Sequence, residues 1–373
     1  MIQRILSQEI VKDFGKGKVL VILGPRQVGK TTLLTLINAQ NEKTLILDCD
    51  NYDDCLVLEN KNKVELHNLV SGYKNVFIDE AQRVKNIGLT LKMLADLHLD
   101  CNIIATGSSS LDLADGIFET ATGRIYEYTM LPFSLVELAN HTNERDEKRL
   151  LEQRMIFGLY PEVVNNPSDA QRMLSTLVNS YLFKDIFAYK GLKKPDMLRK
   201  LVIALALQIG NEVSYNELSN LIGIDKETVE YYINLLEKCF IVFRLDSYNR
   251  NLRTELKKGK KIYFYDNGIR NAIISNFTSL DLRSDSGALW ENLMVSERHK
   301  RNLYSASYAQ SYFWRTVTQK EIDLVEWQDG LLHAYEFKWK ENKKISVPKD
   351  FIAAYPDSTF ETITPSNFWS FLR

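Results

Sequence analysis

The first part of the chain alternates short apolar runs with segments whose apolar residues recur at helical spacing. Segments 30–40 and 88–99 have the helical spacing. The runs around them predict a buried strand at 18–24 and further strands at 43–50, 75–82, 102–110 and 124–130. Because strands alternate with helices, the pattern predicts an α/β fold in which a parallel sheet carries helices on both faces.

The pattern changes beyond residue 140. The charged segment 141–149 has no apolar face and predicts a surface joint, and 150–210 is mostly helical. Residues 213–245 predict two short helices, and strands at 240–246 and 260–265 complete the order of a winged helix. From Gly287 we expect a helix and then strands within 311–316, 321–327 and 332–339. The expected parts are therefore 1–140, 141–210 (a helical connector), 211–280 (a winged helix) and 281–373 (a small α/β domain).

The stretch "GPRQVGKT" follows the first predicted strand and opens the first predicted helix. It matches G-x-x-x-x-G-K-[ST] in the context that this pattern requires. Glycines let backbone N–H groups turn towards phosphate oxygens, and the helix N-terminus adds partial positive charge. Lys30 would bridge the β- and γ-phosphates of ATP, and Thr31 would ligate Mg²⁺. The predicted cofactor-binding residues here are Gly24, Pro25, Arg26, Gln27, Val28, Gly29, Lys30, Thr31 and Thr32.

Polar residues end two further predicted strands. Asp79 ends the strand in "NVFIDEAQ", where its carboxylate is placed to hold the Mg²⁺ directly or through water. Glu80 follows it and is the candidate general base that polarises the attacking water. In "IIATGSSS", Thr106 or Ser108 is a candidate for contact with that water or the γ-phosphate, and a capped turn is the alternative.

These motifs together resemble the prokaryotic AAA+-type P-loop ATPases of the archaeal-ATPase-like group. The resemblance also covers "TGRIYEYTMLPFSLVEL", "GLYPEVV" at 158–164, the two-helix segment and the terminal strands. In that group the ATPase domain is fused to a C-terminal domain of unknown function. The resemblance implies a role for Arg124, either as a sensor of the γ-phosphate or as a finger on a neighbouring copy. An ordinary surface arginine is the alternative.

Acidic and basic residues recur on the last predicted strands. Glu336 and Lys338 lie two residues apart, so both side chains point to one face, and Asp323 lies in the preceding strand. With Glu291 on the helix before them, this order resembles the PD-(D/E)xK nuclease core. The resemblance implies a metal held by Asp323 and Glu336. The alternative is a solvated strand edge, because Glu321 lies beside Asp323.

The charge pattern of the winged-helix segment is mixed. The second helix, within 225–238, carries more acids than bases, which suits a DNA-reading helix poorly. The loop 250–261 is basic, with Arg250, Arg253, Lys257, Lys258, Lys260 and Lys261 against Glu255. Such a loop would contact a phosphate backbone without reading its sequence. A solvated hairpin is the alternative.

Composition limits the remaining choices. The 373 residues are 45% hydrophobic and 25% charged, with a net charge of −1, so no global field attracts nucleic acid or an anionic membrane. Four cysteines without metal spacing and the lack of a long apolar segment lead us to expect a cytoplasmic protein without membrane contact. The sequence predicts a Mg²⁺-dependent ATPase. An ATP-gated nuclease and a non-hydrolysing switch or scaffold are the alternatives, and a homo-oligomeric state is left open.

Overall fold

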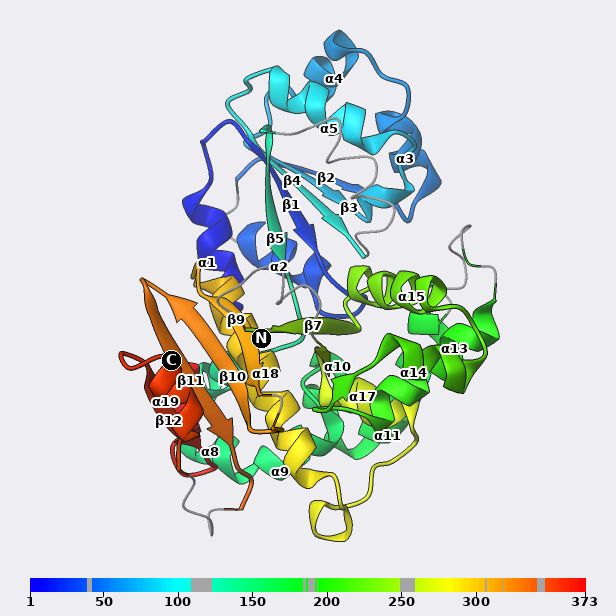
Figure 1. Cartoon of the computed structure of the whole chain (residues 1–373). Coiled ribbons are helices and arrows are strands. Elements are labelled where there is room, and N and C mark those ends of the chain that lie inside the picture. The colour runs from blue at the N-terminus through cyan, green and yellow to red at the C-terminus, as the bar shows by residue number, and fades with distance from the viewer. Residues whose placement is uncertain are drawn as a thin grey trace. The chain divides into compact units, whose positions relative to one another are not determined.

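A computed structural model describes most of the chain, and it divides into two compact units (Figure 1). The described residues are 1–38, 42–108, 123–183, 186, 192, 194–248, 259–305, 307–316, 318–340 and 346–373. Unit 1 comprises Met1–Leu131 with Lys238–Phe240, and unit 2 comprises Pro132–Glu237 with Ile241–Arg373. Each unit has its own sheet.

Unit 1 is the predicted parallel sheet with helices. Its strands run in the order β2-β3-β4-β1-β5, and all neighbouring pairs are parallel. The strands are β1 (Val19–Leu23), β2 (Thr44–Asp48), β3 (Asn75–Asp79), β4 (Asn102–Gly107) and β5 (Ile125–Thr129). The helices are α1 (Ile5–Lys12), α2 (Lys30–Ile37), α3 (Tyr52–Leu58), α4 (Lys63–Val70), the 3-10 turn η2 (Ala81–Arg83) and α5 (Ile87–Asp96).

The central strands of unit 1 are apolar because the sheet is covered on both faces. Every residue of β1, β3 and β4 is buried, as expected for parallel strands between helical layers. Their side chains form one core with apolar residues of α3, α4 and α5. Because all strands are parallel, the carboxyl ends of β1, β3 and β4 meet at one edge of the sheet. This edge therefore gathers the polar residues that follow each strand.

Unit 2 contains the remaining helices and a second sheet. Its helices before the hairpin are α7 (Leu135–His141), α8 (Glu144–Arg149), α9 (Leu151–Phe157), α10 (Pro161–Asn165), η3 (Pro167–Asp169), α11 (Ala170–Thr176), η4 (Leu177–Leu182), α13 (Pro195–Leu207), α14 (Tyr215–Ile222) and α15 (Lys226–Lys238). Those after it are α17 (Asn267–Ile273), η5 (Leu280–Leu282), α18 (Ser286–Tyr304), α19 (Lys349–Ala354) and α20 (Phe368–Leu372).

The seven strands of unit 2 form one sheet in the order β12-β11-β10-β9-β7-β8-β6. They are β6 (Glu212–Val213), β7 (Val242–Ser247), β8 (Lys260–Phe264), β9 (Gln310–Arg315), β10 (Glu321–Gln328), β11 (Leu331–Phe337) and β12 (Thr359–Ile363). Strand β7 pairs with β9 in parallel, through Asp246 with Tyr312 and Ser247 with Phe313. The expected boundary near residue 280 therefore falls within a single sheet.

Local sequence signals account for the helix pair in unit 2. Ser214 caps α14 by accepting a bond from the Glu217 amide, and Gly223 ends that helix with φ +80°. Asp225 then accepts the Thr228 amide at 2.7 Å at the start of α15. These three residues, which can cap a helix or adopt a left-handed conformation, define the predicted turn between the helices.

The charged segment 141–149, for which we predicted a surface joint, is mostly exposed and contains a helix. Residues Glu144–Arg149 form α8, which Asn143 caps by accepting the Asp146 amide. Glu147 is buried and receives two bonds from Arg154, at 3.0 and 3.1 Å. A buried ion pair thus replaces the missing apolar face, and unit 1 ends at Leu131, before this segment.

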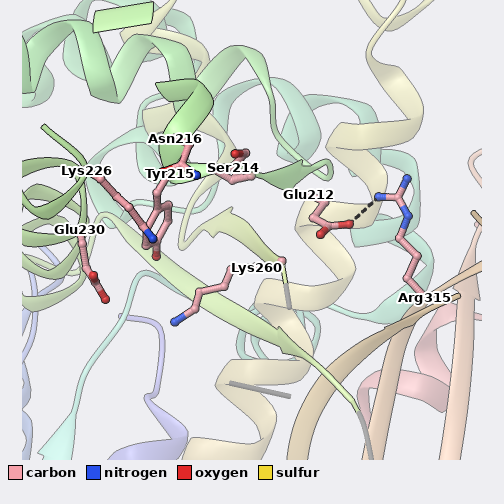
Figure 2. Close-up of a pocket in the computed structure, with 10 residues that line it drawn as sticks. Glu212, Ser214, Tyr215, Asn216, Lys226, Glu230, Lys260 and Arg315 are labelled. Atoms are coloured by element: carbon pink, nitrogen blue, oxygen red, sulfur yellow. Dashed lines mark hydrogen bonds and ion pairs between the residues drawn. The ribbon is translucent and has the colours of Figure 1, made fainter. Parts of the chain in front are cut away.

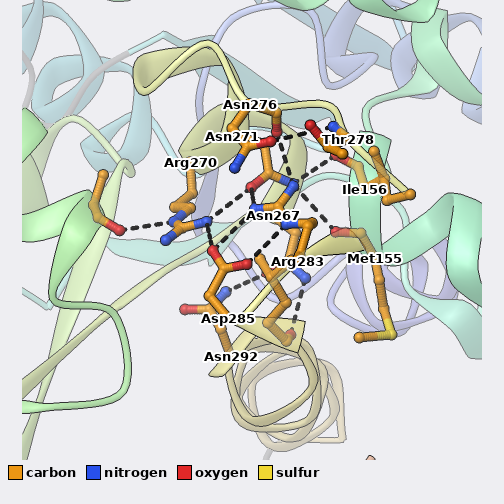
Figure 3. A network of polar contacts seen from close by, with 12 residues as sticks. Met155, Ile156, Asn267, Arg270, Asn271, Asn276, Thr278, Arg283, Asp285 and Asn292 are labelled. Carbon is orange, nitrogen blue, oxygen red and sulfur yellow. Dashed lines mark hydrogen bonds and ion pairs between the residues drawn. The ribbon is translucent and has the colours of Figure 1, made fainter. Parts of the chain in front are cut away.

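Buried polar side chains join distant parts of unit 2 (Figure 3). Arg270 donates to Ala206 O at 2.7 Å and to Asp285 at 2.6 Å, and Asn271 donates to Ile156 O at 2.8 Å. Arg283 binds the same Asp285 through its Nε at 2.8 Å. The network ties α9, α13 and α17 to the segment before α18, and its groups satisfy one another as buried polar groups must.

Candidate functional site

The loop between β1 and α2 is held by close backbone contacts. A Cβ at Gly24 would lie 2.0 Å from the carbonyl oxygen of Met130, so only glycine fits there. Gly29 has φ +93° and starts α2 from a left-handed conformation. Glycines at these positions let the loop curl at the helix N-terminus, where N–H groups and the helix dipole favour anions.

Lys30 is buried in this loop. Its Nζ donates to the carbonyl oxygens of Gly24 and Pro25, both at 2.9 Å. The ammonium is thus held by the backbone of the same loop that would bind the phosphates. Carbonyl oxygens are neutral acceptors, so phosphate oxygens would attract the same ammonium more strongly.

Three residues from three elements meet at the carboxyl edge of the sheet. Thr31 on α2 donates its hydroxyl to Asp79 Oδ2 at 2.5 Å. Thr106, fully buried on β4, donates to the other oxygen of Asp79. Asp79 and Thr31 are the predicted Mg²⁺ residues, and the oxygen donors that a hard cation prefers are adjacent here. The residues present therefore fit a nucleotide-bound Mg²⁺.

Glu80 follows in an unusual backbone conformation. Its φ is +48°, and its N–H donates to Asp79 Oδ1 at 3.2 Å and to Thr106 Oγ1 at 3.1 Å. Its carboxylate accepts a bond from the amide of Gln82, which also donates to Ser108 Oγ at 2.9 Å. Thr106 and Ser108 thus both reach this site, and Gln82 is a residue that sequence reasoning missed.

Arg124 lies elsewhere in unit 1. It precedes β5, its carbonyl accepts the Val19 amide at the start of β1, and its side chain forms an ion pair with Asp96. Since β1 and β5 are parallel and the nucleotide loop follows the other end of β1, Arg124 lies at the opposite edge of the sheet. The structure does not bring it together with Lys30, Asp79 and Glu80.

A buried arginine that belongs to no sequence motif stabilises the nucleotide loop. Arg4 is 3% exposed and donates to Val28 O at 2.9 Å and to Leu131 O at 2.6 Å. It links the nucleotide loop to the chain after β5. A lone arginine before a helix carries no motif, so nothing in the sequence signals this role.

The C-terminal residues also converge, but around a lysine that was not predicted. Lys261 on β8 is 1% exposed, and its Nζ lies 3.0 Å from Glu291 Oε1 and 3.9 Å from Asp323 Oδ1. It also forms an ion pair with Glu321. Although burial opposes the charge, these carboxylates raise the pKa of Lys261 above its ordinary value. The ammonium therefore lies beside Asp323, one of the two acids expected to hold a metal, and forms its closest ion pairs with Glu291 and Glu321.

The acids of this cluster hold their protons more tightly than usual. Burial and the nearby charge of Asp323 raise the pKa of Glu291 to about 7, and burial also raises the pKa of Asp323 and of Glu336. Lys338 donates to Glu336 at 2.7 Å, and the Phe337 amide donates to Asp323 at 2.9 Å. In the part of the chain that the structure describes, no group of three acidic, histidine or cysteine side chains is arranged to hold a metal ion.

Strand alternation places the neighbour of Lys261 in a different environment. Lys260 lines a polar cavity of about 590 Å³ with Lys226, Arg315 and the start of α14 (Figure 2). Glu212 in the same cavity forms an ion pair with Arg315 at 2.8 Å. Of the predicted basic loop, residues 250–258 lie outside the described residues.

Comparisons with known proteins agree with the geometry of unit 1. Residues 16–139 match the family described as an AAA domain. This part of the chain is therefore similar to AAA domains, and its parallel sheet with the nucleotide loop has the P-loop ATPase fold. Residues 148–280 and 286–365 match two domains of unknown function, DUF8612 and DUF4143. None of these three family matches spans half of the chain.

Relatives that align with most of this chain occur in bacteria and archaea. An uncharacterized protein of Mycobacterium tuberculosis is 26% identical over 354 residues, covering 92% of this chain and 75% of the relative. An uncharacterized protein of Methanocaldococcus jannaschii is 24% identical over 411 residues, covering 97% and 87%. The solved structure of a Walker-type ATPase of Pyrococcus abyssi has a TM-score of 0.51 at 16% identity, covering 74% of this chain and 96% of that one. This likeness concerns the fold.

None of the described helices is both long enough and apolar enough to cross a bilayer.

Proposed function

We propose that the protein is a Mg²⁺-dependent ATPase whose reaction occurs at the carboxyl edge of the sheet in unit 1. The observation that carries the proposal is the convergence of Lys30 and Thr31, at the start of α2, with Asp79 and Glu80, at the end of β3, around one loop. The match of this region to AAA domains supports it. A glycine-rich turn without function would not require this set of side chains.

The residues divide the work by their chemistry. The loop amides and Lys30 bind the phosphates, and Thr31 and Asp79 would hold Mg²⁺, which would neutralise phosphate charge. Glu80 would accept a proton from water as the water oxygen attacks the γ-phosphorus and the bond to the β-phosphate oxygen breaks. Thr106 keeps Asp79 oriented through its buried hydroxyl. Arg124 has no cis role in this proposal, because it lies at the other edge of the sheet.

Two substitutions separate binding from hydrolysis. Lys30→Ala removes the only side-chain cation that the motif directs at the phosphates, so it should weaken ATP binding and abolish turnover while unit 1 stays folded. We expect phosphate release at background level and a weaker Kd for a fluorescent ATP analogue. Wild-type turnover by a folded Lys30→Ala protein would contradict the assignment.

Glu80→Gln tests the general base. The substitution preserves shape and removes basicity, so nucleotide binding should persist while kcat falls by about 10²–10⁴. Loss of ATP binding in Glu80→Gln would instead assign Glu80 to the metal or to the fold. If wild type binds ATP but never releases phosphate, the protein is a nucleotide switch or scaffold.

We also propose that the nucleotide state of unit 1 is coupled to unit 2. The order β6, α14, α15, β7 and β8 supports a winged helix there, and the three bases Lys226, Lys260 and Arg315 outnumber the two acids Glu212 and Glu230 in the lining of its cavity. Nonspecific contact with a nucleic-acid backbone would weaken steeply with salt. Stimulation of ATP turnover by DNA or RNA at low salt tests this coupling.

The nuclease alternative has less support than the ATPase. Its candidate residues Glu291, Asp323, Glu336 and Lys338 lie in one cluster, but Lys261 neutralises the acids internally. The cluster therefore does not fit a divalent metal as it stands, and we derive no cleavage step from it. Metal-dependent cleavage of nucleic acid by wild type, lost in Asp323→Ala, would restore the alternative.

A further inference from the structure

Gln82 has an unmet hydrogen-bonding group in the middle of the ATPase site. It lies in η2, two residues after Glu80 and three after the end of β3. Its Oε1 is buried and has no hydrogen-bond partner among the described residues, whereas its Nε2 donates to both Glu80 and Ser108. The ionised carboxylate of Glu80 can only accept, so the NH₂ side of the amide must face it. The unmet acceptor is therefore not removed by flipping the amide.

The two amide donors of Gln82 connect the ends of two strands. One bond reaches Glu80, the candidate base after β3, and the other reaches Ser108 directly after β4. The backbone of Glu80 is already fixed, because its N–H donates to Asp79 and Thr106. The backbone bonds do not restrain the side-chain torsions of Glu80. The hydrogen bond from Gln82 to the Glu80 carboxylate does.

A buried acceptor without a partner is rare in folded proteins and destabilises them. A residue that served packing alone would be replaced by an apolar side chain without this cost. We propose that Gln82 is a positioning residue for Glu80: its amide fixes the carboxylate in the orientation from which Glu80 polarises water, with Ser108 as the second anchor. The inference rests on the proposed ATPase function and deepens it.

Two substitutions of Gln82 separate positioning from packing. Gln82→Ala removes both amide donors, so kcat should fall about ten-fold while the Kd for ATP stays within about two-fold of wild type. Gln82→Glu has almost the same shape but places a second carboxylate against Glu80, so it should lower kcat further than Gln82→Ala does. If Gln82 only filled space, the isosteric Gln82→Glu would retain more activity than Gln82→Ala.

The experiment measures phosphate release and nucleotide binding on the full chain, with thermal unfolding as a check of folding. Gln8→Ala, the same change at an exposed position of α1, is the matched control and should leave kcat unchanged. Ser108→Ala leaves Gln82 in place but removes one anchor. The decrease in kcat in Ser108→Ala should be smaller than the decrease in Gln82→Ala. The two decreases should not add in the double variant, because both substitutions act through the amide of Gln82.

The outcomes are distinct. Full kcat in folded Gln82→Ala, faster turnover in it, or a loss of ATP binding in both Gln82 variants would each overturn the positioning role and leave the ATPase proposal standing. A wild-type protein that binds ATP without hydrolysing it would overturn both. A loss of kcat alone, larger in Gln82→Glu, supports the inference.

Discussion

A single glycine allows close contact between two segments that lie far apart in the sequence. Gly158 has φ +71°, and a Cβ on it would lie 2.0 Å from Oδ1 of Asp266, which is buried and caps α17. Asp266 also accepts the Leu159 amide at 2.7 Å. The glycine of "GLYPEVV" is thus required by a carboxylate more than a hundred residues later, which the sequence alone does not indicate.

Gly158→Ala should therefore destabilise unit 2 strongly. At φ +71° and ψ −159° the backbone of Gly158 lies in a region that is almost exclusive to glycine, where an alanine costs about 1–3 kcal/mol, and overpacking against Asp266 adds about 1–3 kcal/mol. Gly223→Ala is the control, because Gly223 has φ +80° with nothing near its missing Cβ, so only the backbone cost applies. Chemical denaturation measures both. Equal losses in the two variants would contradict the steric role of Asp266.

Glu291 makes the stability of unit 2 depend on pH. Its pKa is about 7 in the folded protein against an ordinary 4.5, so the folded state binds the proton more tightly. Between these values the folded state holds more protons, and the contribution of Glu291 to stability is full below pH 4.5 and lost as pH rises to about 7. His299 acts in the opposite sense, because burial lowers its pKa to about 4.

The prediction is therefore a difference between two proteins. Residue 291 cannot ionise in the Glu291→Gln variant. As pH rises from about 4.5 to 7, the free energy of unfolding of this variant should therefore increase relative to that of wild type, by on the order of 1–3 kcal/mol. Urea denaturation at several pH values measures both profiles, and the His299 contribution cancels in the difference. A difference that stays constant across this range would contradict the assignment.

At the scale of elements, the parallel sheet of unit 1 was predictable from the sequence. Its strands β1, β3 and β4 are buried on both faces, so each is mainly an apolar run, and turns and helices separate them clearly. The nucleotide loop after β1 and the acids at the end of β3 were also predictable, because they directly follow strands that the sequence indicates clearly. Gln82 and Arg4 were not, since their roles depend on contacts rather than on a pattern.

Strand β8 shows why the C-terminal site was harder to predict. Lys260 and Lys261 belong to one basic run in the sequence, yet alternation along the strand turns them to opposite faces. Lys260 lines the polar cavity, whereas Lys261 is buried among acids that come from α18 and β10. A local charge count assigns both lysines to one solvated loop. Only the pairing of distant strands separates them.

At the scale of the whole molecule, the middle and last thirds of the chain depend on one another. Strand β8 provides Lys261, while α18 and β10 provide Glu291, Glu321 and Asp323, all within unit 2. The segments expected as separate winged-helix and nuclease-like parts thus share a sheet and a buried charge cluster. Substitutions in this cluster should affect the stability of unit 2 without changing ATP turnover per folded molecule in unit 1.

Lys261→Ala tests whether the ammonium does the neutralising work of a metal ion. Removing it leaves buried carboxylates unpaired, which should destabilise unit 2 by roughly 3–5 kcal/mol. Mn²⁺ or Mg²⁺ prefers carboxylate oxygens and would bind the folded state of this variant, so either ion should raise its Tm in a concentration-dependent way. Lys260→Ala is the matched control. Its ammonium lies 3.7 Å from Asp246 and is partly exposed, so its loss should cost little and confer no metal response. Wild-type stability in Lys261→Ala, or equal metal responses in both variants, would show that Lys261 does not neutralise the cluster.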